Sequence, residues 1–196
     1  MLTKHLLDVA WGLRSKAPTL NLRDRNVLRA ALHFSAALMV GSEKVLEKAV
    51  EAIPNEVNPF LQSLKAYYVR HLAEERGHFN WLMDDLEEPF KVDWNAAEIV
   101  GAQYYAIEHW TPVALLGYLL VMEAFPMPME LVSALEELHG KKLLRCVRYH
   151  AEHDLEHREE LYQMLNSVPE SYAQIIEQNV VHTLTLFSIA QKSWGV

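Results

Sequence analysis

Apolar residues recur every three or four positions in long segments of this chain, which is the spacing of one face of an α-helix. Glycine and proline are few, at 7 and 8 residues, and they gather between these segments. No alternation of apolar and polar residues next to Asn-Gly or Asp-Gly marks a β-hairpin. The pattern therefore predicts an all-α protein.

Breaks in the pattern set the expected helices. Asp93 is a candidate cap, Thr111-Pro112 is typical of a helix start, and Gly140 is typical of a helix end. We expect helices over residues 2–13, 26–39, 43–53, 60–86, 94–109, 112–124, 129–139, 141–165 and 170–192. No linker divides them, so residues 1–196 are expected to form a single domain, a helical bundle of seven to nine helices.

One expected helix carries polar groups on its apolar face. His150, Asp154 and His157 follow one another at steps of four and three residues, so they point to the same side of a helix. The stripe is apolar beyond them, from Leu143 on one side to Leu161 on the other. Because polar groups without partners are costly on a core face, these side chains are expected to have partners. Two imidazoles and a carboxylate form half of a metal site.

A second expected helix repeats this stripe. His71, Glu75 and His78 have the same spacing, and Leu64 and Leu82 continue their stripe in the two directions. If the two helices face each other, their ligand-capable groups converge in one dry layer. A lone histidine on a core face is more often a hydrogen-bonded core residue, but the repetition favours a metal site.

Glu123 extends the apolar face of the helix that begins at Pro112. A carboxylate in that place should be paired, protonated or bound to a metal, and a buried salt bridge is the plain alternative. Imidazole and carboxylate donors suit iron or manganese, and zinc less specifically. Glu74 and His153 flank the stripes and are expected on a solvated face.

Charge and composition exclude several classes of protein. A net charge of −8 and a pI near 5.7 argue against a nucleic-acid partner. The single cysteine, Cys146, forms no internal disulfide, as expected in the cytoplasm. The longest apolar run, from Pro112 to Met122, is shorter than the roughly 20 residues that span a bilayer. We therefore expect a cytoplasmic protein without a membrane partner.

Three motifs carry a resemblance to a known family. They are His71-Leu72-Ala73-Glu74-Glu75-Arg76-Gly77-His78, the segment from Pro112 to Tyr118 with Glu123, and His150-x3-Asp154-x2-His157. From about Phe34 to Leu165 the chain resembles the iron-containing redox enzyme family of heme-oxygenase-like proteins. The resemblance implies a heme-oxygenase-like fold, often dimeric. It also implies a non-heme diiron site in those members called heme-oxygenase-like diiron oxidases.

The resemblance also implies a set of ligands. These are Glu75 or the residue at 71, together with His78, Glu123, His150, Asp154 and His157. Where several members have a glutamate seven residues before the first ligand histidine, this chain has His71. Other members take a further carboxylate from an earlier helix, for which Glu43 is the nearest candidate. An imidazole-rich site of this kind is expected to hold two irons, or one firmly, with manganese as the alternative metal.

The leading hypothesis is an enzyme: an iron-dependent oxidase or oxygenase that uses O2 in a homodimer. Its substrate is expected to be a small organic acid, an amino acid or a fatty-acid-like molecule. Glu75 and Glu123 would act in catalysis as well as in ligation, and Tyr104, Tyr105, Leu116 and Leu120 would wall an apolar pocket.

Three other functions remain open. One is a metal-free protein that resembles thiaminase II and binds a small heterocycle. Another is heme degradation, for which His5 and His33 are the candidate proximal histidines. The third is a non-enzymatic carrier of a metal or an apolar ligand.

Overall fold

The computed structural model describes residues 1–55 and 57–194, without the side chain of Asp154. In this part of the chain nine α-helices and three short 3-10 helices form, and no strand does. The α-helices are α1 (Leu2–Arg14), α2 (Arg25–Ala52), α3 (Pro59–Glu75), α4 (His78–Leu86), α5 (Trp94–His109), α6 (Leu115–Glu123), α7 (Met129–His139), α8 (Arg145–Asn166) and α9 (Ala173–Lys192). The 3-10 helices are η1 (Pro112–Ala114), η2 (Lys141–Leu144) and η3 (Glu170–Tyr172). The all-α prediction is confirmed.

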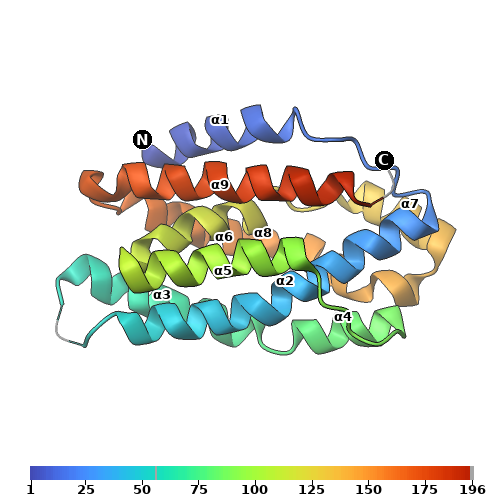
Figure 1. Ribbon diagram of the computed structural model, residues 1–196, viewed down its shortest axis with the longest axis horizontal. Helices are drawn as coiled ribbons and strands as arrows, with labels where there is room; N and C mark the ends of the chain where they lie inside the picture. The colour runs from blue at the N-terminus through green and yellow to red at the C-terminus, as the bar shows by residue number, and fades with distance from the viewer. Residues whose placement is uncertain (56, 195–196) are drawn as a thin grey trace.

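The helices form a bundle with α6 at its centre. α1 and α9 lie side by side along one side, and α2, α3 and α4 run along the opposite side (Figure 1). α5 packs between α2 and α9, while α6 contacts α5, α8 and α9. Every residue of α6 except Met122 is buried, as expected for a helix that is apolar all round. No helix in the described residues is both long and apolar enough to span a bilayer.

The predicted cap Asp93 is confirmed, because it accepts hydrogen bonds from two backbone N–H groups at the start of α5. Asp24 caps α2 in the same way by accepting from the backbone N–H of Asn26. Thr111 caps η1, in which Pro112 is the first residue, and Gly140 follows α7 with a φ of 95°. The side chains of Asp24, Asp93 and Thr111 satisfy backbone N–H groups that a helix start leaves without partners.

The predicted break at Gly41-Ser42-Glu43 is wrong, because α2 runs through it without interruption. Gly41 lies against α5 instead. A Cβ atom at Gly41 would meet the Cγ2 atom of Val100 at 2.6 Å, which is too close for two carbon atoms. Here glycine permits the close approach of two helices rather than ending one.

The predicted single helix over residues 60–86 is also wrong, because the chain breaks between α3 and α4. Gly77 has a φ of 91°, a conformation that L-residues with a side chain rarely adopt. Its backbone N–H donates a hydrogen bond to Glu43 Oε1 at 3.2 Å. The break therefore has a partner on α2, and it places His78 at the first position of a new helix.

Candidate metal centre

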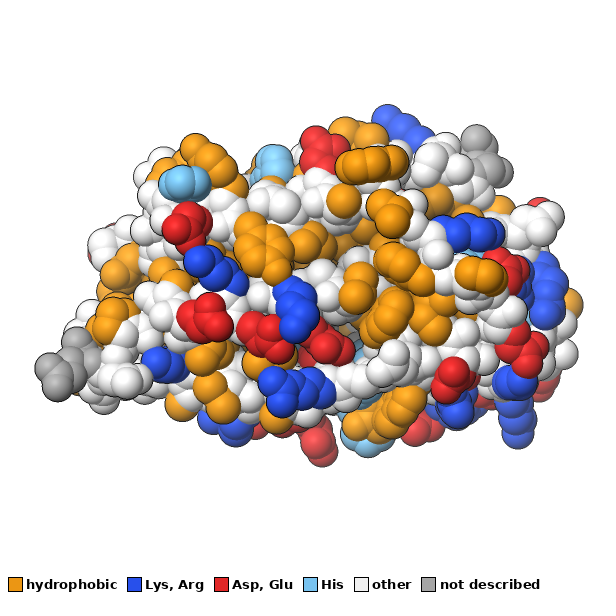
Figure 2. Space-filling model, turned by 60° about the horizontal axis from the view of Figure 1, so that its bottom comes forward, with side chains coloured by type: hydrophobic (Ala, Val, Ile, Leu, Met, Phe, Trp, Pro, Cys, Tyr) orange, Lys and Arg blue, Asp and Glu red, His pale blue; other side chains and the backbone are white. Residues whose placement is uncertain are grey.

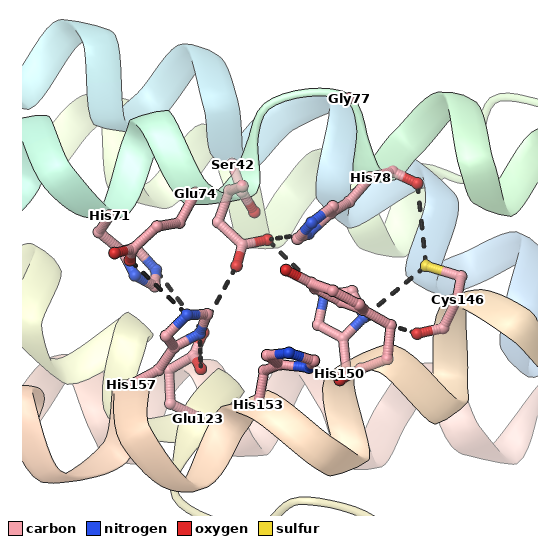
Figure 3. A network of polar contacts seen from close by, with 12 residues as sticks. Ser42, His71, Glu74, Gly77, His78, Glu123, Cys146, His150, His153 and His157 are labelled. Atoms are coloured by element: carbon pink, nitrogen blue, oxygen red, sulfur yellow. Dashed lines mark hydrogen bonds and ion pairs between the residues drawn. The ribbon is translucent and has the colours of Figure 1, made fainter.

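Six of the seven predicted site residues converge in the interior of the bundle. They come from the end of α3, the start of α4, the end of α6 and the middle of α8: His71, Glu75, His78, Glu123, His150 and His157. Their side chains are between 3% and 21% exposed. In Figure 3, His71, His157 and Glu123 lie at one end of the cluster, and His78 and His150 lie at the other. Asp154 lies in α8, but its side chain is outside the part of the chain that the structure describes.

Glu75 joins the two ends of this cluster. Its Oε2 atom lies 3.1 Å from Nδ1 of His78 and 3.7 Å from Nε2 of His150. Its Oε1 atom lies 3.9 Å from Nδ1 of His157. Two groups of ligand atoms, each within 4.8 Å of one another, share this carboxylate: His71–Glu75–His157 and Glu75–His78–His150. Oε2 thus faces the imidazoles of His78 and His150, while Oε1 faces the imidazole of His157, which is grouped with His71.

Glu123 adds a second carboxylate at the first end. Its Oε1 atom lies 3.6 Å from Nε2 of His71, and its Oε2 atom lies 3.7 Å from Nδ1 of His157. The ring of Tyr67 stacks on the ring of His71 with a centroid distance of 5.8 Å. This end therefore offers two imidazoles and two carboxylates in a compact space.

A backbone carbonyl orients the imidazole at the other end. Nδ1 of His150 donates a hydrogen bond to the carbonyl oxygen of Cys146 at 2.9 Å, which leaves Nε2 directed at Glu75. The backbone N–H of Cys146 in turn donates to Asp85 Oδ2 at 2.9 Å, which ties α8 to α4. Metal-binding histidines commonly have such a carbonyl partner on the second nitrogen, because it fixes the tautomer and the ring orientation.

The charges in the cluster are coupled. Burial on its own raises the pKa of Glu75, but hydrogen bonds from His150 and His78 hold it well below its ordinary value. Burial lowers the pKa of His150, and contacts with Cys146 and Glu75 raise it far above the ordinary value. The hydrogen bond with Glu123 raises the pKa of His157 to about 9. In the absence of a cation, protons on His150 and His157 therefore offset the negative charge of the carboxylates.

The donor set and the geometry fit a cation. Nitrogen and oxygen donors of this kind suit iron and manganese. Glu75 Oε1 is buried without a hydrogen-bond partner among the described residues, although a buried carboxylate oxygen ordinarily has one. A metal ion between Oε1 and the neighbouring imidazoles would satisfy it.

Three residues considered from the sequence lie at the edge of the cluster or outside it. Glu74, expected on a solvated face, is 43% exposed, yet its Oε2 atom lies 3.6 Å from Nε2 of His157. Glu43, considered as a ligand, binds the backbone of Gly77 instead. Tyr105, expected in the wall of the pocket, lines a different cavity together with Asn179 of α9.

The two candidate heme ligands pair with carboxylates. His5 contacts Glu177 at 2.9 Å, and His33 contacts Glu88 at 2.8 Å. Neither arrangement favours heme as a ligand.

No protein-family model and no curated protein sequence matches the chain. Two solved structures resemble it closely in shape. A domain of unknown function from Shewanella denitrificans OS217, described as having a heme oxygenase-like fold, matches with a TM-score of 0.72 and 14% identity, over 98% of this chain and 90% of that one. A TenA homolog from Pseudomonas syringae pv. tomato strain DC3000 matches with a TM-score of 0.76 and 11% identity, over 98% of this chain and 92% of that one. At these identities the likeness establishes the fold alone, and the chain has the heme oxygenase-like fold that the resemblance of its sequence implied.

Proposed function

We propose that the protein is a non-heme iron-dependent oxidoreductase that uses O2, with two iron ions held on either side of Glu75. Manganese is the alternative metal. The observation that carries this proposal is the position of Glu75, whose Oε2 faces His78 and His150 and whose Oε1 faces His157. A carboxylate with one oxygen toward each of two sites can bridge two metal ions.

Each proposed site has its own ligands. One ion would be held by His71, His157, Glu123 and Glu75 Oε1, and the other by His78, His150 and Glu75 Oε2. Bundle proteins with two metal ions use the same kind of donors from facing helices. When bound, iron supplies the chemistry of O2 activation, and the protein supplies geometry and a water-poor cavity.

The chain's own groups would then bind substrate and move protons. A cavity of approximately 260 Å³ adjoins the cluster, and Glu75, Glu123 and His150 line it together with apolar residues such as Leu38 and Met39. Glu123 and His157 form a carboxylate–imidazole pair at this cavity, a pair that can accept and return a proton. The small volume and the apolar walls favour a small organic acid, an amino acid or a fatty-acid-like substrate.

Metal content tests the proposal directly. The protein is purified with Fe(II) under anaerobic conditions, and metal per chain is counted by elemental analysis. The wild type is expected to hold two ions. Glu75→Ala should lose both, whereas His71→Ala and His78→Ala should each lose one, because each removes a ligand of a single site. His153→Ala is the matched control, since His153 bonds only to the carbonyl of Tyr149 in the described contacts and should leave the metal content unchanged.

Two results would contradict the proposal. The proposal is contradicted if the wild-type protein holds neither iron nor manganese after incubation with these metals. Equal metal content in the wild type and in folded Glu75→Ala would show that the metal binds elsewhere.

A metal-free function is the second candidate, and the likeness to a TenA homolog is the observation that favours it. In that case the cavity would bind a small heterocycle, and Glu75 or Glu123 would act as a general acid or base. Such a protein would contain no iron by elemental analysis after treatment with Fe(II). It would gain thermal stability with heterocyclic ligands but not with metal ions.

A further inference from the structure

A second cavity adjoins the one beside the cluster, and most of its walls are apolar. Its volume is approximately 350 Å³, and α2, α4, α8 and α9 all contribute to it. Buried leucines form much of the wall, for example Leu28, Leu32 and Leu82. An apolar cavity of roughly 150 Å³ already binds benzene, and pockets for small molecules begin at roughly 300 Å³. The cavity is therefore large enough for a ligand, and its apolar walls are unfavourable for a group of water molecules.

Two polar atoms in the wall of this cavity have no partner. Nε1 of Trp194 and Oε1 of Gln191 are buried, and neither has a hydrogen-bond partner among the described residues. Trp194 is only 9% exposed, and its ring packs on the ring of Phe34 with a centroid distance of 4.9 Å. This contact holds the indole N–H inside the protein. Because a buried polar atom ordinarily has a partner, the two atoms indicate a bound polar group.

The two atoms come from the same turn of the chain and differ in kind. The backbone N–H of Trp194 donates a hydrogen bond to the carbonyl oxygen of Gln191 at 3.2 Å, and residues three apart in such a turn point to the same side. An indole nitrogen can only donate a hydrogen bond, and an amide oxygen can only accept one. A single hydroxyl group can satisfy both, since it accepts from the first and donates to the second.

Charged head groups do not match this pair. A carboxylate has only acceptors, so it would place an oxygen against Gln191 Oε1. An ammonium group has only donors, so it would place an N–H against Trp194 Nε1. Arg14 also lines the cavity, but its side chain is exposed, so water competes for its charge. The pair therefore favours a neutral ligand.

We propose that this cavity binds a neutral aliphatic alcohol. The hydroxyl group accepts a hydrogen bond from Trp194 Nε1 and donates one to Gln191 Oε1, and the hydrocarbon chain lies against the leucines. This ligand differs in charge from the organic acids proposed for the cavity beside the cluster. The two polar groups lie at and just after the end of α9 rather than in the cluster. Binding therefore does not require metal and does not rest on the proposed function.

Calorimetry on metal-free protein tests the choice of head group. The three probes are 1-octanol, octanoate and octylamine, which have the same chain length and differ in charge. Wild type should bind 1-octanol more tightly than either charged probe. Tighter binding of octanoate or octylamine would overturn the proposal. So would the absence of 1-octanol binding, since water alone would then satisfy the two atoms.

Two variants test the two hydrogen bonds. Trp194→Phe removes the N–H and keeps a ring that can pack on Phe34, and Gln191→Met removes the amide and keeps the length of the side chain. Each should weaken 1-octanol binding about two- to tenfold, the range for one hydrogen bond. Methyl octyl ether separates the two effects, because its oxygen accepts but does not donate. Its affinity should fall in Trp194→Phe and stay unchanged in Gln191→Met.

Matched controls change exposed residues of the same two types. Trp110→Phe and Gln174→Met should leave 1-octanol binding unchanged, since both side chains are exposed and neither lines this cavity. Circular dichroism checks that each variant is folded. Equal 1-octanol affinity in the wild type and in either folded variant, Trp194→Phe or Gln191→Met, would overturn the proposal.

Discussion

At the scale of single residues, the role of Glu75 follows from tertiary contacts that spacing alone does not specify. The repeated stripe predicted that His71, Glu75 and His78 share a face and meet the histidines of the other stripe. It did not predict that Glu75 Oε2 faces His78 and His150 while Oε1 faces His157, because this depends on how α3, α4 and α8 approach one another. His71 itself lies beside Glu123, and the carboxylate shared by the two groups of ligand atoms is that of Glu75.

His157 gives a prediction for the pH dependence of stability. Its pKa is raised to about 9 by the hydrogen bond with Glu123, whereas the pKa of histidine in an unfolded chain is about 6.5. A raised pKa contributes stability that is complete below pH ~6.5 and is lost as the pH rises through about 9. In metal-free protein, the difference in the free energy of unfolding between wild type and His157→Gln should therefore shrink between pH ~6 and pH ~9.5.

Urea unfolding at the two pH values measures this difference. The metal-bound protein should show the opposite trend in metal affinity, which should rise with pH because a metal ion binds the neutral imidazole. A difference between wild type and His157→Gln that stays constant with pH would contradict the assigned charge of His157.

At the scale of helices, the sequence predicted where most helices lie, but the predicted helix boundaries near Gly41 and Gly77 were wrong. Near Gly41 the dipeptide Gly-Ser suggests a break, yet the glycine is there because Val100 of α5 packs against it. Near Gly77 the apolar residues keep their helical spacing across the break between α3 and α4, so the pattern does not indicate the break. In both cases a residue on another helix, Val100 or Glu43, contacts the glycine. The local sequence pattern contains no information about that contact.

The effect of replacing Gly77 on stability can be compared with the effect of replacing Gly101. Gly77→Ala places a side chain at a φ of 91° and should cost about 1–2 kcal/mol in the free energy of unfolding. Gly101→Ala changes an exposed glycine within α5 that has nothing within 4 Å of a new Cβ atom. It should stabilise the protein by about 0.5–1 kcal/mol, because alanine favours a helix.

Chemical denaturation of the two variants compares these effects. Gly77→Ala should also reduce metal content at the His78 site, because Gly77 sets the start of α4. Equal stability changes in the two variants would show that the break does not require glycine.

At the scale of the whole molecule, the bundle brings four helices together around one polar cluster. α3, α4, α6 and α8 supply its ligand-capable groups, although α6 and α8 lie far from α3 and α4 in the sequence (Figure 1). On the face seen in Figure 2, basic side chains are interspersed with acidic and hydrophobic ones, without a continuous basic surface.

The position of bound metal is the most direct test of the whole account. Crystals grown with Mn(II) are measured by anomalous X-ray diffraction. Two anomalous peaks are expected, roughly 3.5–4 Å apart, one on each side of the Glu75 carboxylate. Peaks confined to surface carboxylates, or no peak among His71, His78, His150 and His157, would contradict it.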